Sequence, residues 1–63
     1  MKKFALLKLK FNANLVVADH ECIVKAEAVR YFRGLFGDTL PLDDDGYYKN
    51  GDTTFCVAEY FRP

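Results

Sequence analysis

Residues 47–61, YYKNGDTTFCVAEYF, contain the pattern that decides the fold. Two runs rich in aromatic and β-branched residues flank the dipeptide Asn50-Gly51. This dipeptide is a strong hairpin signal, because both central residues of a type I′ turn need a positive φ. A turn at this point places Lys49 opposite Asp52. The stretch therefore predicts a C-terminal antiparallel β-hairpin with an Asn-Gly turn.

The N-terminal stretch predicts a first strand. Residues 3–11, KFALLKLKF, alternate with a period of two. One set of alternating residues is entirely apolar, and we expect it to face the core: Ala5, Leu7, Leu9 and Phe11. The other set mixes apolar and basic side chains: Phe4, Leu6, Lys8 and Lys10. The asparagines within 12–14 favour a reversal, and residues 15–17 then form a second strand that pairs back on the first.

The middle of the chain predicts one amphipathic helix that ends at Gly37, a residue suited to the left-handed C-cap position. Asp19 is the expected N-cap, since its carboxylate accepts the free amide hydrogens of a first turn. The start is ambiguous, because Lys25 then lies inside the apolar face and Ile23 outside it. In the alternative, the second strand reaches Val24 and the helix starts late. The apolar face at 100° per residue comprises Ala26, Ala28, Val29, Tyr31, Phe32, Leu35 and Phe36.

These elements predict one α+β domain over residues 1–63, in the order ββαββ, with a single amphipathic helix packed on a small antiparallel sheet. Hydrophobic residues make up 51% of the chain, which is more apolar surface than one helix on a small sheet easily hides. An exposed apolar patch on the uncovered face of the sheet would mark an interface. If the first and last strands are neighbours, we expect a homodimer held by Phe4, Leu6, Phe55, Val57 and Phe61.

The charges are unevenly distributed although the formal net charge is zero. Residues 1–36 carry seven basic and three acidic residues, a net of +4, and residues 37–63 carry two basic and six acidic residues, a net of −4. The two halves either neutralise each other, within one fold or across a dimer, or steer a charged partner.

Neither metal binding nor a cofactor is expected. The aspartates 43–45 resemble a calcium loop, but Gly46 comes too early for the EF-hand spacing and the twelfth position is Thr54. Only His20, Cys22 and Cys56 are soft ligands for zinc, which needs about four. We expect the two cysteines to be small buried hydrophobic residues.

The sequence gives no sign of catalysis or of membrane insertion. The chain contains no serine and no glycine-rich phosphate loop, and a single helix on a small sheet leaves little room for a substrate pocket. No apolar run approaches the roughly 18 residues of a membrane span. We therefore expect a non-enzymatic protein of the cytoplasm, with reduced thiols.

Protein recognition is the function that these residues favour. Tyrosines anchor many interfaces, and aspartates beside them steer a basic partner. We expect the partner-binding residues to be Asp43, Asp44, Asp45, Tyr47, Tyr48, Arg30 and Arg33. The alternative, without a binding role, is that the aspartates only solvate a loop and the tyrosines pack on the sheet.

Two other functions stay open. Tyr47, Tyr48, Arg30 and Arg33 suit a pocket between protomers for a small anionic ligand such as a nucleotide. The Lys-rich first strand suits nucleic acid, less well because the pI is near 6.5. In size and lack of motifs the chain is similar to small accessory proteins of phages and mobile elements, many of which inhibit a host factor.

Overall fold

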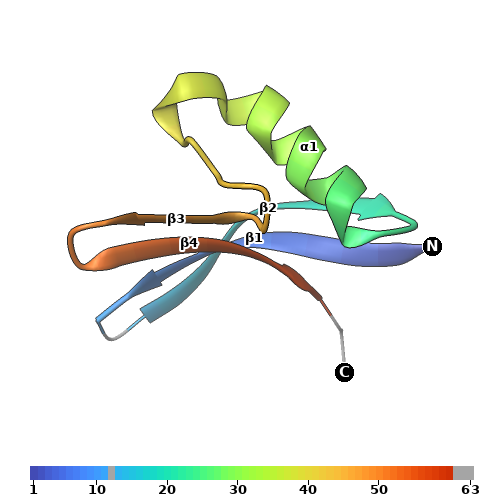
Figure 1. The fold of residues 1–63 in the computed structure, drawn as a ribbon. Coiled ribbons are helices and arrows are strands. Elements are labelled where there is room, and N and C mark those ends of the chain that lie inside the picture. Colours follow the sequence, from blue (N-terminus) through green and yellow to red (C-terminus); the bar gives the residue numbers. More distant parts are fainter. Residues whose placement is uncertain (12, 61–63) are drawn as a thin grey trace.

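The computed structural model describes residues 1–11 and 13–60, which form a four-stranded antiparallel sheet with one α-helix on one face (Figure 1). In chain order the elements are β1 (Lys2–Lys10), β2 (Ala13–Cys22), α1 (Lys25–Phe36), the short 3-10 helix η1 (Gly37–Thr39), β3 (Tyr47–Asn50) and β4 (Thr53–Glu59). The predicted α+β class and its ββαββ order are therefore confirmed.

The strands lie in the order β2-β1-β4-β3. β1 and β4 form the centre of the sheet and pair antiparallel, from Phe4 opposite Glu59 to Leu9 opposite Thr54. The first and last strands are thus neighbours, which was the condition of the dimer prediction, and their pairing joins two hairpins into one sheet. β2 and β3 are its two edge strands.

The core lies between α1 and the sheet. β1 contributes Phe4 and Leu6, and β4 contributes Val57. The helix contributes Ala28, Val29 and Phe32, and the remaining buried members of the cluster are Cys22, Leu40 and Leu42. Both cysteines are buried as free thiols, which confirms their expected role as small core residues.

The predicted dimer interface is wrong in its residues. Phe4, Leu6 and Val57 are only 4%, 0% and 2% exposed, and Phe55 packs against the same cluster. Phe61 lies outside the described residues. Because Phe4, Leu6 and Val57 are buried beneath the protein's own helix and Phe55 is partly buried there, these four residues do not form an uncovered face.

The two faces of β1 were assigned the wrong way round, and the lengths of the elements explain why. Leu7 and Leu9, which the sequence placed in the core, are only half-buried. The 12 residues of α1 span about 18 Å, whereas the nine residues of β1 span about 30 Å. The helix therefore covers only part of the strand, the part that carries Phe4 and Leu6. Lys10, on the same face, is left to solvent.

β2 is longer, and α1 starts later, than the favoured boundaries predicted. Asp19 does not cap a helix, because residues 18–22 continue β2 and pair with residues 2–6 of β1. Glu21 lies opposite Lys3, and such opposite-charge neighbours stabilise a strand pair. α1 begins at Lys25 with Val24 in an extended conformation as its N-cap, close to the alternative left open above.

The helix ends as predicted, but the C-terminal hairpin turns one residue later. Gly37 is the C-cap of α1, with φ of 57°. In the hairpin Asn50 pairs with Thr53, so the central residues of the turn are Gly51 and Asp52. Within the described residues, positive φ occurs only at glycines, and Gly51 has φ of 61°. A positive φ at the first central residue alone is the pattern of a type II′ turn rather than type I′.

Candidate functional site

The acidic segment from Asp43 to Gly46 forms a hydrogen-bonded turn, here called the acidic turn. One carboxylate oxygen of Asp43 accepts hydrogen bonds from the backbone N–H groups of Asp45 and Tyr47, each at 2.9 Å. The backbone N–H of Asp43 donates to the carbonyl of Tyr47 at 2.8 Å. Asp43 therefore has a structural role at the entrance to β3, which differs from the partner contact that the sequence suggested.

Gly46 holds this turn close to the core. Its carbonyl accepts a hydrogen bond from the N–H of Val57 at 3.0 Å, and its φ is 84°. A Cβ at this position would lie 3.0 Å from side-chain atoms of Val29 and Val57, closer than carbon atoms pack. Only glycine lets the turn approach the helix and β4 this closely.

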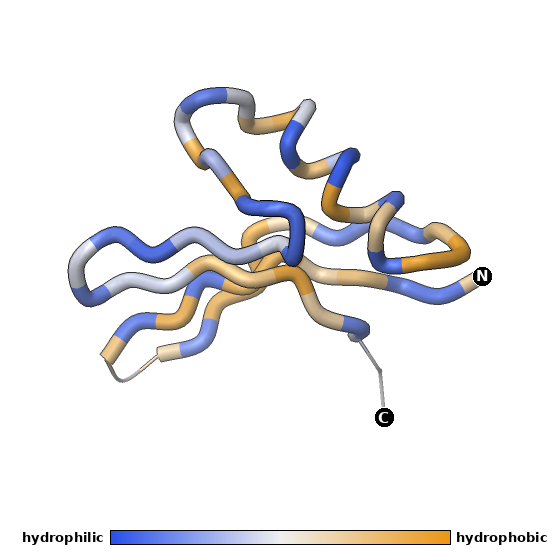
Figure 2. Tube along the Cα trace, viewed as in Figure 1, coloured by the Kyte–Doolittle hydropathy of each residue, from blue (hydrophilic) through white to orange (hydrophobic). Residues whose placement is uncertain are grey.

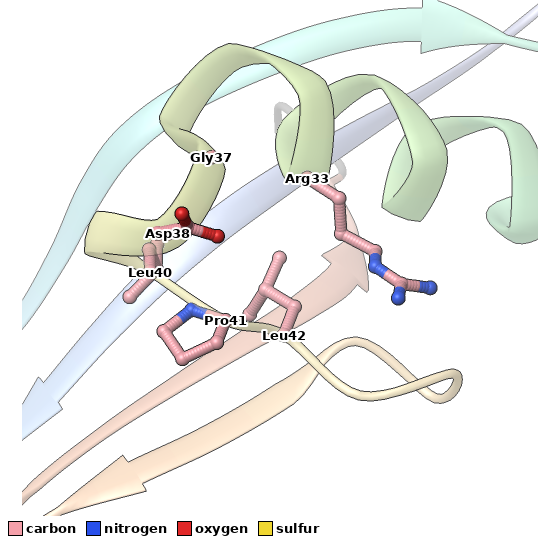
Figure 3. A pocket seen from close by; sticks show the side chains of 6 residues that line it. All are labelled: Arg33, Gly37, Asp38, Leu40, Pro41 and Leu42. Atoms are coloured by element: carbon pink, nitrogen blue, oxygen red, sulfur yellow. The ribbon is translucent and has the colours of Figure 1, made fainter.

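Arg33 reaches from the helix to the same turn. Its guanidinium lies 3.3 Å from a carboxylate oxygen of Asp44, and Figure 3 shows its side chain extending along the chain segment that follows Leu42. The Asp44 side chain is 99% exposed, and such surface pairs contribute little to stability. Asp44 and Asp45 nevertheless remain open to solvent.

The two tyrosines of the predicted site have different environments. Tyr48 is half-buried, packs against the core cluster and stacks on Phe55 with ring centroids 6.2 Å apart. Tyr47 is 51% exposed, and the ammonium group of Lys25 lies 5.9 Å from the centre of its ring. Tyr47 is therefore available to a partner, whereas Tyr48 mainly supports the fold.

The arginines of the predicted site line two different hollows. Arg30 borders a hollow of about 290 Å³ with His20, Glu27 and Tyr31. Arg33 borders a second hollow, of about 220 Å³, at the end of the helix, together with Gly37, Asp38, Leu40, Pro41 and Leu42 (Figure 3). The predicted set thus divides into Arg33 with the acidic turn on one side and Arg30 with His20 on the other.

Neither hollow brings together the side chains of a metal centre. Searched over residues 1–11 and 13–60, the structure has no group of three His, Cys, Asp or Glu side chains placed to hold a metal ion. The first hollow combines one carboxylate, Glu27, with the cationic side chain of Arg30. Arg30 would attract an anionic ligand, but Glu27 would repel it.

The longest run of exposed large apolar residues in the described part of the chain lies on β2, and it was not predicted as a site from the sequence. Leu15, Val16 and Val17, here called the apolar edge, are 57%, 48% and 42% exposed. Consecutive residues of a regular strand point to opposite faces, yet all three are open because β2 is an edge strand and their end of it lies beyond the helix. The signal was present as an apolar, β-branched run with no charge.

A bulge sits within the apolar edge. Leu7 of β1 pairs with Val16, whereas Leu6 pairs with Ala18. Val17 is therefore the extra residue of a β-bulge, where two residues of one strand oppose one of the other. Phe11, at the turn of the same hairpin, is 90% exposed.

The two edges of the sheet differ in character. Figure 2 shows apolar stretches along the β1–β2 hairpin, whereas the far end of the β3–β4 hairpin is mostly hydrophilic. β3 has four residues and includes Lys49, while β2 has ten. Short length and lysine are devices that protect an edge strand from pairing. The first half of β2 carries neither device.

None of the helices in the described part of the chain is long and apolar enough to cross a membrane. Comparison of the chain with protein-family models, with curated proteins and with solved structures found no match in any of the three.

Proposed function

We propose that this protein is a non-catalytic protein-binding module and that it binds through the apolar edge of β2. The observation that carries the proposal is the run of three consecutive exposed apolar residues, 15–17, on an edge strand of ten residues. In strand addition, an extended segment of a partner pairs with such an edge, and main-chain hydrogen bonds supply affinity while side chains supply specificity.

Two sources of free energy favour this surface. The outer N–H and C=O groups of an edge strand are ready to pair with another strand. Burying a large apolar side chain contributes about 1.5–3 kcal/mol when it passes from full exposure to full burial. Leu15, Val16 and Val17 are about half exposed. On full burial each of the three would therefore contribute roughly half of that free energy.

The acidic turn is a weaker candidate for the same function. Asp43 is used to build the turn, and Tyr48 packs against the core. What remains for a basic partner is Asp44, Asp45 and Tyr47, of which Asp44 already has an arginine beside it. This surface fits a secondary contact better than a primary one.

The other two functions have less support. For a small anionic ligand, the four expected residues would have to line one pocket, but Arg30 and Arg33 border separate hollows. For nucleic acid, the four lysines of β1 would have to act together, but two of them have a carboxylate beside or opposite them: Lys2 lies 3.6 Å from Glu59 and Lys3 lies opposite Glu21. Both remain weaker proposals.

The setting that we propose is the cytoplasm, where free thiols such as Cys22 and Cys56 persist. We propose inhibition of a host factor as the use of such a module, on the analogy of size and lack of motifs with phage accessory proteins.

A matched pair of variants tests the binding surface. Leu15→Lys places a charge on the apolar edge, while Leu35→Lys makes the same change on the helix at nearly the same exposure, 57% against 55%. Each tagged variant is used to capture proteins from cells of the source organism, followed by mass spectrometry. We expect Leu15→Lys to lose a partner that wild type and Leu35→Lys retain. A partner that all three baits capture equally would contradict the proposal.

A further inference from the structure

We propose that the segment paired with the apolar edge is the β2 strand of a second copy of this chain, so that two sheets join into one continuous eight-stranded sheet. The inference rests on the proposed function, since it assigns the occupant of the same edge. Its support comes from the charge pattern along β2, from the contrast between the two edges and from the symmetry that antiparallel pairing imposes.

The charge pattern favours antiparallel pairing centred on the apolar edge. Residues 13–18 of β2 carry no charge, and Asp19 and Glu21 follow. Two antiparallel copies whose centre lies within residues 14–17 keep these acids away from those of the partner, because each acid falls either opposite an uncharged residue or beyond the start of the partner's β2. A parallel pair in register places Asp19 beside Asp19 and Glu21 beside Glu21, and like charges directly opposite each other destabilise a strand pair.

The bulge refines where pairing is centred. Bulges twist an edge and interrupt regular hydrogen bonding. Val17 is the extra residue of β2, so the regular part of β2 on this side of the bulge is the segment from Ala13 to Val16. This segment contains Leu15 and Val16, two of the three exposed residues that define the edge.

The contrast between edges favours a closed dimer. Pairing β2 with β3 of the next copy would be head-to-tail, and such contacts propagate into open assemblies when the rotation does not close. β3 offers only four residues with Lys49 among them. Pairing β2 with β2 instead uses the same surface on both copies, which is the arrangement of a two-fold dimer.

Symmetry then fixes where the helices lie. Two antiparallel edge strands that continue one sheet are related by a two-fold axis perpendicular to that sheet. The axis preserves the faces of the sheet, so the α1 helices of both copies lie on the same side. Figure 1 shows the end of β1 and the start of β2 projecting beyond α1, which leaves this end of the edge clear of the helix.

The first test measures the mass of the protein in solution. Sedimentation equilibrium and light scattering of the wild type, over a wide concentration range, are expected to show a dimer. Leu15→Lys is expected to be monomeric, and Leu35→Lys to remain dimeric, with circular dichroism confirming that both variants fold. A wild type that is monomeric at every concentration, or a Leu15→Lys variant that stays dimeric, overturns the second-copy proposal.

A second test, by cysteine cross-linking, does not depend on whether Leu15→Lys folds. Single substitutions Leu15→Cys, Val16→Cys and Val17→Cys each place an exposed thiol on the edge, while the native Cys22 and Cys56 are buried. Under a mild oxidant we expect at least one of them to form a cross-linked dimer rapidly, and Leu35→Cys to remain monomeric on a non-reducing gel. Cross-linking no faster than Leu35→Cys at all three positions contradicts the inference.

The two proposals fail in different ways. A monomeric wild type that captures a cellular partner, which Leu15→Lys loses, would overturn the second-copy proposal and support the proposed function. A dimer that Leu15→Lys leaves intact, together with unchanged capture, would overturn both.

Discussion

The imidazole ring of His20 lies flat on the phenol ring of Tyr31, with ring centroids 3.8 Å apart and an angle of 4° between the planes. His20 belongs to β2 and Tyr31 to α1, so the stack ties the edge strand to the helix beside the core. The rings of Tyr31 and the next helical residue, Phe32, also meet in a T-shaped arrangement, with centroids 5.4 Å apart. A contact between two partly exposed rings thus helps to position β2.

We expect the His20–Tyr31 stack to contribute measurably to stability. Aromatic pairs contribute about 0.5–1.5 kcal/mol beyond the area that they bury. A double-mutant cycle with His20→Ala and Tyr31→Ala, followed by urea unfolding, should give a coupling energy in this range. As a control, the cycle of His20→Ala with Tyr47→Ala should be additive, since Tyr47 is on the opposite edge strand. Coupling as large in the control cycle would contradict the assignment.

Gly46→Ala should be strongly destabilising. Its φ of 84° is unfavourable for alanine, and the new Cβ would overlap Val29 and Val57. Overpacking costs about 1–3 kcal/mol, in addition to about 1–2 kcal/mol for the left-handed conformation. Gly51→Ala is the matched control, because its φ is also positive but open space surrounds it. Chemical unfolding should show the larger loss for Gly46→Ala; equal losses would mean that the turn moves away from the helix freely.

Gly34→Ala should stabilise the protein. Gly34 lies within α1, and a Cβ there would meet nothing within 4 Å. Alanine is favoured over glycine by about 1 kcal/mol inside a helix. Thermal unfolding should therefore show a higher midpoint for this variant. The same substitution at Gly37, where φ is 57°, should lower the midpoint, and a rise at both positions would disagree with the helix boundary.

Asp43→Ala should destabilise the acidic turn, because two backbone N–H groups lose their acceptor. We expect a loss of about 1–2 kcal/mol in the free energy of unfolding. Asp43→Asn retains an oxygen acceptor and should recover most of the loss, while Asp45→Ala should change little. Faster amide hydrogen exchange at Tyr47 in Asp43→Ala would locate the effect, and unchanged exchange would exclude the proposed hydrogen bond.

The sequence was sufficient for the class and order of elements, because these depend on local patterns. Gly37 marked the end of the helix, and the alternation of residues 3–11 marked a strand. It was insufficient for the choice of core face, because the same alternation allows either Phe4 and Leu6 or Leu7 and Leu9 to point inward. That choice depends on where a helix of limited length crosses the strand, which is a tertiary property.

The candidate site was harder to predict for a similar reason. Asp43 looked available for a partner, but its carboxylate is used by backbone groups that only the folded turn brings together. Leu15 and Val16 looked like an ordinary strand, and their exposure depends on β2 lying at the edge of the sheet. Strand order is decided by the pairing of β1 with β4, residues far apart in the chain, which local patterns do not report.

The bulge at Val17 shifts the in-and-out alternation of side chains along β2 by one residue. With strict alternation Asp19 and Glu21 would share a face with Leu15, and Leu15 lies opposite Lys8 on the helix side. The additional residue moves the phase by one, so that His20 and Cys22 point toward the helix and the two acids point away. If β2 alternated strictly through Val17 without the bulge, the inside and the outside would be exchanged for every residue that follows it in the strand.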